Sequence, residues 1–238
     1  MRYFEVPYKS TRLKGTIYGV SDPRVFFVHG SSKDGSARFD MIRQHLAKTG
    51  IASAAFDFIG HGETGGVIDG TTLADRLKQA CTVIDSIHCK KPLIIIGASM
   101  GADTAIRLTK LYPVATLMLF VPAFYSPNAF KASFKEEFHD VIIREDGWKS
   151  SDAWALLKDF LGSLLVVGAE HDEVIPGGIY DALDEHSPLV SYKELITVPG
   201  SPHRVLPFLS ENPGEFARVF ERVYQAIVSA HHLDRHTS

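Results

Sequence analysis

The chain has 238 residues, of which 45% are hydrophobic and 22% charged, and its formal net charge is −3. These proportions are ordinary for a globular protein and exclude a disordered chain, a fibrous protein and a small disulfide-stapled domain. The net charge is close to zero and no block of like charges occurs, so the sequence does not predict a basic surface that would bind nucleic acid.

The cysteine content and the N-terminus indicate an intracellular type of protein. The two cysteines, Cys81 and Cys89, lie in one expected helical stretch but not one turn apart, so neither a disulfide framework nor a zinc site is expected. Residues 1–10 lack the basic and apolar regions of a signal peptide. The longest apolar run, 114–124, is far shorter than the roughly 20 residues that span a bilayer. We therefore expect a cytoplasmic, soluble protein without a membrane span.

The first expected elements form an antiparallel hairpin of residues 2–8 and 13–19, separated by a polar break. Short apolar runs rich in β-branched residues follow, and such runs are typical of parallel strands that are covered on both faces. They occupy residues 24–28, 51–58, 93–96, 115–121, 164–167 and 191–198.

Helical patterns alternate with these runs. They cover residues 38–48, 71–87, 100–111, 179–185 and 215–228, and in the last one apolar residues recur at the spacing of an amphipathic helix. Thr72 and Asp75 resemble a capping box at the start of the second helix. The alternation predicts an α/β fold with a mostly parallel, doubly wound sheet and right-handed crossovers.

Residues 123–161 interrupt this rhythm and carry no strong parallel-strand signal. The stretch is too long for a plain connection in a compact domain, so we expect a small, mostly helical cap inserted into a single domain of residues 1–238. Its aromatic side chains either form a small core of the cap itself or wall a substrate pocket. The expected pocket residues are Phe124, Tyr125, Phe130, Phe134, Trp148 and Trp154.

The strongest chemical signal is Gly97-Ala98-Ser99-Met100-Gly101, with an apolar run before it and a helical pattern after it. A serine on such a strand-to-helix turn is exposed for nucleophilic attack, and the flanking glycines let the backbone pass closely. The alternative is an ordinary turn without chemistry.

A nucleophilic serine needs a base, and the base needs a carboxylate that orients it. In a doubly wound sheet both come from loops at the carboxyl ends of strands. Glu170, Asp172 and Glu173 follow the fifth run, and His203 follows the sixth. We favour Asp172 because the chain has just left the sheet there and a short side chain loses less rotamer entropy. Glu170 is the second candidate.

Combined with His29-Gly30 and the segments at 57–62 and 168–176, these motifs resemble the α/β-hydrolase family over nearly the whole chain. The resemblance implies a serine esterase-like enzyme with Ser99 as nucleophile, Asp172 as acid and His203 as base. It also implies an oxyanion hole formed by the backbone N–H groups of Ser31 and Met100.

Three functions remain open at this point. The first is hydrolysis of carboxylic esters with small to medium acyl groups, through a Ser-His-Asp triad and an acyl-enzyme. The second is an acyl-thioesterase or depalmitoylase with the same triad, and the third is a non-hydrolytic ligand-binding protein. The expected partner is a small-molecule ester or thioester. No cofactor and no metal are expected, because the acidic loop at 170–173 lacks a suitable ligand pair. His29 is expected to brace the loop that presents Ser31.

Overall fold

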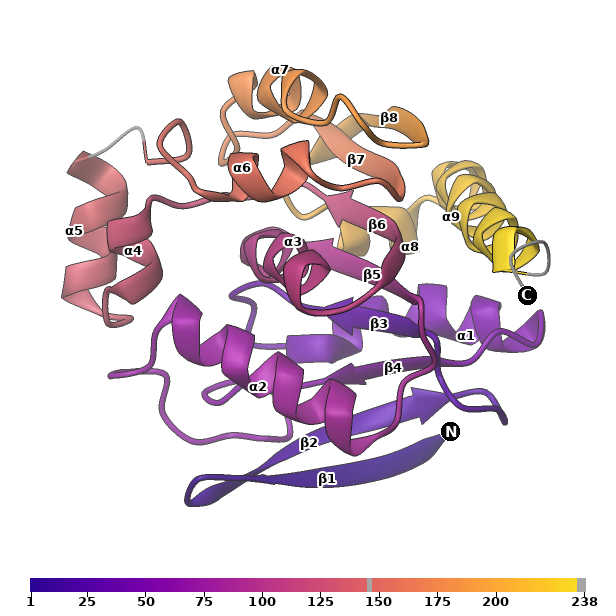
Figure 1. The fold of residues 1–238 in the computed structure, drawn as a ribbon, viewed down its shortest axis with the longest axis horizontal. Helices are drawn as coiled ribbons and strands as arrows, with labels where there is room; N and C mark the ends of the chain where they lie inside the picture. Colours follow the sequence, from indigo (N-terminus) through magenta and orange to yellow (C-terminus); the bar gives the residue numbers. More distant parts are fainter. Residues whose placement is uncertain (145–146, 235–238) are drawn as a thin grey trace.

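Eight strands form one sheet in the order β1-β2-β4-β3-β5-β6-β7-β8 in the computed structural model, which describes residues 1–144 and 147–234 (Figure 1). The expected hairpin is β1 (Arg2–Tyr8) and β2 (Thr11–Tyr18), and β2 continues antiparallel onto β4 (Ser53–Phe56). All remaining pairs are parallel. The prediction of a mostly parallel sheet with an N-terminal antiparallel pair is confirmed.

The apolar runs are the central strands. β3 (Val25–Val28), β4 and β5 (Leu93–Ala98) are buried along their whole length, which is why their sequences are continuous rather than alternating. β6 (Val114–Phe120), β7 (Ser163–His171) and β8 (Tyr192–Pro202) complete the sheet.

Helices cover both faces of the sheet (Figure 1). α1 (Asp40–Lys48) and α9 (Pro213–Asp234) lie on one face, where the His45 ring packs on Phe216 and Phe220. α2 (Leu73–Ser86) and α3 (Met100–Leu111) lie on the other, and α7 (Gly178–Glu185) follows β7. The Thr72 hydroxyl caps α2 by accepting a hydrogen bond from the Asp75 N–H at 3.0 Å.

Two short elements were not expected. A 3-10 helix, η1 (Gly35–Phe39), precedes α1, so the helix expected from residue 38 begins at Asp40. α8 (Val205–Glu211) separates β8 from α9. Both are shorter than two helical turns, too short for a sequence period to be visible.

Residues 123–161 contain α4 (Pro127–Lys131), α5 (Glu136–Arg144) and α6 (Ala153–Lys158). Figure 1 shows α4 and α5 beside the end of the sheet, while α6 lies over α3. Arg107 of α3 joins this segment to the sheet domain: it donates to the buried carboxylate of Asp103 at 2.8 Å and to Asp152 at 2.5 Å, and it stacks on the Phe130 ring.

Candidate active site

Ser99 occupies the turn between β5 and α3 with φ 50° and ψ −124°, a backbone conformation that residues other than glycine rarely adopt. The two glycines around it are required by close packing. A Cβ at Gly97 would lie 2.7 Å from the Ala105 Cβ, and a Cβ at Gly101 would lie 2.2 Å from the Val28 carbonyl oxygen. The sharp turn therefore presents Ser99 at the carboxyl end of β5, and the close packing around Gly97 and Gly101 fixes its position.

Sheet register brings the other predicted residues to the same edge. β3 pairs with β5 so that Val28 lies opposite Gly97, which places the chain after Val28 beside Ser99. β7 pairs with β8 so that His171 lies opposite Pro202, and the next residues along each strand are Asp172 and His203.

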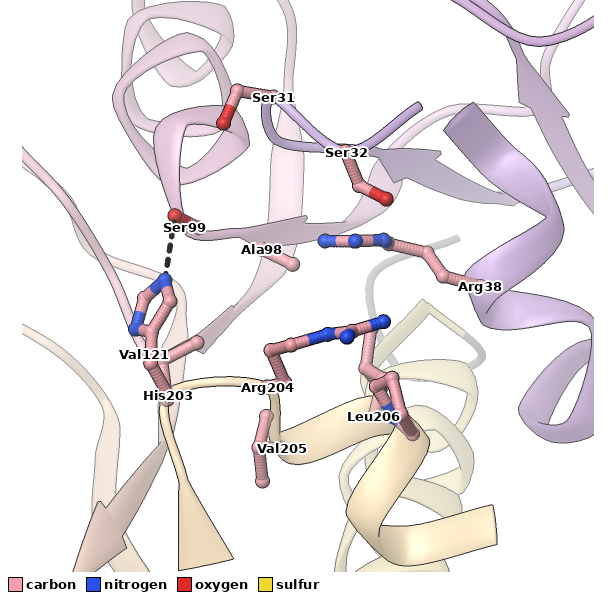
Figure 2. Close-up of a pocket in the computed structure, with 11 residues that line it drawn as sticks. Ser31, Ser32, Arg38, Ala98, Ser99, Val121, His203, Arg204, Val205 and Leu206 are labelled. Carbon is pink, nitrogen blue, oxygen red and sulfur yellow. Dashed lines mark hydrogen bonds between the residues drawn. The ribbon is translucent and has the colours of Figure 1, made fainter. Parts of the chain in front are cut away.

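The side chains of Ser99, His203 and Asp172 form a hydrogen-bonded chain. The Ser99 Oγ lies 3.1 Å from His203 Nε2 (Figure 2), and His203 Nδ1 lies 3.0 Å from the Asp172 Oδ2. The Asp172 Oδ1 also accepts the N–H groups of Val174 and Ile175, both at 2.9 Å. The carboxylate is thus held from its own loop, and both of its oxygens lie within hydrogen-bond distance of His203 Nδ1, at 3.1 and 3.0 Å.

Neither of the other acidic candidates contacts His203. The Glu170 carboxylate accepts the Gly200 N–H at 2.7 Å and ties the end of β7 to β8. Glu170 belongs to the part of β7 that is still paired with β8, since the pairing extends to His171. Asp172 follows the last paired residue, where the chain turns inward, and its carboxylate therefore reaches His203.

The loop after β3 lies against the Ser99 turn. A Cβ at Gly30 would lie 3.2 Å from the Ser99 Cβ and 3.4 Å from the Met100 nitrogen, so only glycine lets the loop approach this closely. Within residues 1–144 and 147–234, neither the Ser31 N–H nor the Met100 N–H donates a hydrogen bond to another group. Two backbone donors are therefore available beside the Ser99 hydroxyl.

His29 is fully buried beneath this loop. Its Nδ1 contacts the Gly30 carbonyl at 2.7 Å and its Nε2 accepts the Phe58 N–H at 3.1 Å, so the ring is neutral with the proton on Nδ1. Burial, and then the nearby Arg76 guanidinium, lower the pKa of His29 well below its ordinary value. Arg76 donates to the carbonyls of His29 and Gly30 at 2.6 and 2.9 Å. Both side chains hold the loop in place.

A pocket of about 260 Å³ opens beside Ser99 (Figure 2). The two charged side chains in its wall, Arg38 and Arg204, were not singled out from the sequence, although Arg204 directly follows His203. It is lined by Ser31, Ser32, Arg38, Ala98, Ser99, Val121, His203, Arg204, Val205, Leu206 and Pro207.

None of the six aromatic residues expected to wall a substrate pocket lines this one. Phe134 packs with Phe138 in a small apolar cluster that also contains Met100, and Trp154 packs on Phe124 in the main core. Phe124, Tyr125 and Trp148 line a separate cavity of about 240 Å³. The 123–161 segment lies close to α2 and α3, and most of these rings pack where the segment contacts the rest of the protein.

Among the residues that the structure describes, no three His, Cys, Asp or Glu side chains gather in a way that could hold a metal ion. No helix in the described part of the chain is long and apolar enough to cross a membrane.

Residues 20–145, more than half of the chain, match the Hydrolase_4 family, described as serine aminopeptidase, S33. No curated protein sequence matches the chain significantly. Among solved structures, a predicted CIB-like hydrolase from Thermoplasma acidophilum shares 22% identity at a TM-score of 0.66, over 93% of this chain and 97% of that one.

A monoacylglycerol lipase from Paleococcus ferrophilus shares 19% identity at a TM-score of 0.66, over 90% of this chain and 99% of that one. The thioesterase domain from the curacin biosynthetic pathway shares 15% identity at a TM-score of 0.66, over 92% and 98%. The sheet order, the Ser99 turn and the family match together show that the chain belongs to the serine aminopeptidase S33 family of α/β-hydrolases.

Proposed function

We propose that the protein is a serine hydrolase that cleaves carboxylic esters of small to medium acyl groups through an acyl-enzyme. The observation that carries the proposal is the hydrogen-bonded chain from Ser99 through His203 to Asp172, at a strained strand-to-helix turn. The likeness of the fold to a lipase and a thioesterase domain supports acyl transfer to water.

In the proposed reaction, His203 Nε2 takes the Ser99 hydroxyl proton while Oγ attacks the acyl carbon. Asp172 accepts a hydrogen bond from the Nδ1–H of His203, which keeps the imidazole in the reactive tautomer and stabilises the imidazolium that forms. The oxyanion accepts hydrogen bonds from the Ser31 and Met100 N–H groups, which are preorganised because the backbone holds them. The leaving oxygen takes the proton from Nε2. Water then attacks the acyl-enzyme with Nε2 as base, and Ser99 is released as the hydroxyl.

Thioester hydrolysis is the second candidate, because the same steps expel a thiolate and the thioesterase domain shares the fold. Aminopeptidase activity, which the family description names, is disfavoured by charge. An aminopeptidase binds a cationic α-amino group, whereas the charged side chains lining the pocket beside Ser99 are the guanidinium groups of Arg38 and Arg204.

Labelling with a fluorophosphonate, followed by peptide mass spectrometry, tests the proposal. We expect a single adduct on Ser99, and we expect Ser99→Ala to keep its fold and lose at least about 10⁴-fold in kcat on p-nitrophenyl butyrate. Rates on butyryl thioesters and on an aminoacyl p-nitroanilide then rank the three reactions. An unlabelled Ser99, or a Ser99→Ala variant that retains several per cent of the rate, would contradict the nucleophile assignment.

A further inference from the structure

Two arginines reach into the pocket beside Ser99 from different parts of the chain (Figure 2). Arg38 belongs to η1, before α1, and Arg204 follows His203 at the start of α8. They are 166 positions apart in sequence, and the contact between η1 and α8 brings them to one cavity. The same cavity contains Ser99, so a molecule held by the arginines can also reach the Ser99 hydroxyl.

Neither guanidinium is neutralised by the protein. Within residues 1–144 and 147–234, no carboxylate lies within 4.0 Å of the side-chain nitrogens of Arg38 or Arg204. The Arg38 Nε is buried and lacks a hydrogen-bond partner in this part of the chain. Asp34 is the acidic residue that acts on Arg38, and it already accepts the Ser32 hydroxyl at 3.3 Å.

The arginines also repel each other. Burial lowers the pKa of Arg38, Asp34 opposes this, and the positive charge of Arg204 lowers it further. Two buried arginines elsewhere have carboxylate partners: Arg107 pairs with Asp103 and Asp152, and Arg43 lies 3.5 Å from Asp40. Among the described residues, the buried Arg76 has none and donates instead to the carbonyls of His29 and Gly30. Two cations without a carboxylate partner in one cavity favour the entry of an anion.

We propose that this pocket binds an anionic group of the substrate, a carboxylate or a phosphate, between Arg38 and Arg204. The preferred substrates are then esters or thioesters that carry such a group in their acyl or leaving part. Planar guanidinium groups suit this role because their paired N–H donors match the oxygens of both anions. The inference rests on the proposed role of Ser99 and specifies the substrate class of that site.

The second cavity has the opposite character. It is lined by residues of the 123–161 segment and the loop after Asp172, with apolar side chains such as Phe124, Trp148 and Ile175, and none of its lining residues in the described part of the chain is charged. One of its lining residues, Ala123, donates its N–H to the Ser99 carbonyl at 3.2 Å. Of the two cavities, the one that contains Ser99 is therefore the cationic one, and it is the side on which an anionic group is expected.

The test compares matched substrate pairs. In the carboxylate arm, p-nitrophenyl hemiglutarate is compared with its neutral amide, p-nitrophenyl glutaramate. In the phosphate arm, butyryl-coenzyme A is compared with the butyryl thioester of N-acetylcysteamine. We expect the wild-type kcat/KM to favour the anionic member of at least one pair by about tenfold or more, because a charge-assisted hydrogen bond contributes a factor of about 10 to 100. The preference should weaken as salt is added.

The variants Arg38→Gln and Arg204→Gln should each lower the anionic-to-neutral ratio about tenfold, and Arg38→Lys should retain part of it. Using a ratio cancels any effect of Arg204→Gln on the adjacent His203. Lys33→Gln is the matched control: it removes one exposed positive charge from the same loop, outside the pocket, and should leave the ratio unchanged.

Calorimetry of glutarate and inorganic phosphate with the Ser99→Ala protein gives a readout that needs no turnover. Binding that Arg38→Gln weakens supports the proposal. Equal wild-type rates on both members of each pair, together with no arginine-dependent anion binding, would overturn it. Absence of hydrolysis and of Ser99 labelling, with anion binding intact, would instead contradict the proposed function.

Discussion

Replacing Gly30 with alanine tests whether the loop after β3 supplies an oxyanion donor. The added Cβ would lie 3.0 Å from the Ala98 carbonyl oxygen, 3.2 Å from the Ser99 Cβ and 3.4 Å from the Met100 nitrogen. These contacts are a few tenths of an ångström tighter than ordinary van der Waals distances, and the neighbours are backbone atoms or the Ser99 side chain. The loop must therefore move away from Ser99 by a similar distance, and it carries the Ser31 N–H with it.

Complete loss of one oxyanion donor costs about 10²–10³ in kcat, so a partial displacement should cost about 10- to 100-fold. We expect the loss in kcat with KM little changed, because the donor acts on the transition state rather than on substrate binding. Steady-state kinetics on p-nitrophenyl butyrate measure this, and urea unfolding checks that the protein stays folded.

Gly214→Ala is the matched control, since a Cβ at Gly214 meets no atom within 4 Å and lies in the first turn of α9. It should leave kcat unchanged and keep or raise stability. A folded Gly30→Ala protein with kcat within twofold of wild type would refute the assignment of the Ser31 N–H.

Three other predictions follow from the site and its supports. Asp172→Asn should lower kcat by up to about 10⁴-fold with KM little changed, while Glu170→Gln stays within about tenfold; the reverse ranking in steady-state kinetics would show that the acid is misassigned. Arg107→Met leaves the buried Asp103 carboxylate unpaired and should lower the free energy of unfolding in urea by about 3–5 kcal/mol; a change below 1 kcal/mol would contradict the proposed attachment of the cap. Because burial lowers the pKa of His29, only the unfolded chain binds a proton at this residue below pH 6.5. This residue alone should therefore lower the free energy of unfolding by about 1.4 kcal/mol for each pH unit of acidification, and His29→Asn should reduce that slope by about one proton.

Local patterns were sufficient for the strands of the sheet and for the turn that carries Ser99. Short apolar runs predict buried strands because a strand covered on both faces must be apolar throughout, and every such run is a strand of the sheet. The turn around Ser99 was also visible, because both flanking glycines are demanded by contacts within a strand, its turn and the following helix.

Choosing among the acids needed more than local pattern. Asp172, Glu170 and Glu173 are chemically alike, and the contact with His203 depends on how far β7 stays paired with β8 before the chain turns. The sequence argument from loop position pointed to Asp172, but the register of two strands about 30 residues apart decides which carboxylate reaches the imidazole.

The cap and the arginine pair were decided by tertiary structure alone. An aromatic residue such as Phe134 is equally suited to a pocket wall or to a small core, and its neighbours Phe138 and Met100 determine which it becomes. Arg38 and Arg204 look like ordinary surface residues in sequence, and the contact between η1 and α8 makes them two sides of one pocket. Periodicity reports the burial of an element, whereas the partners of its side chains depend on which distant elements the sheet brings together.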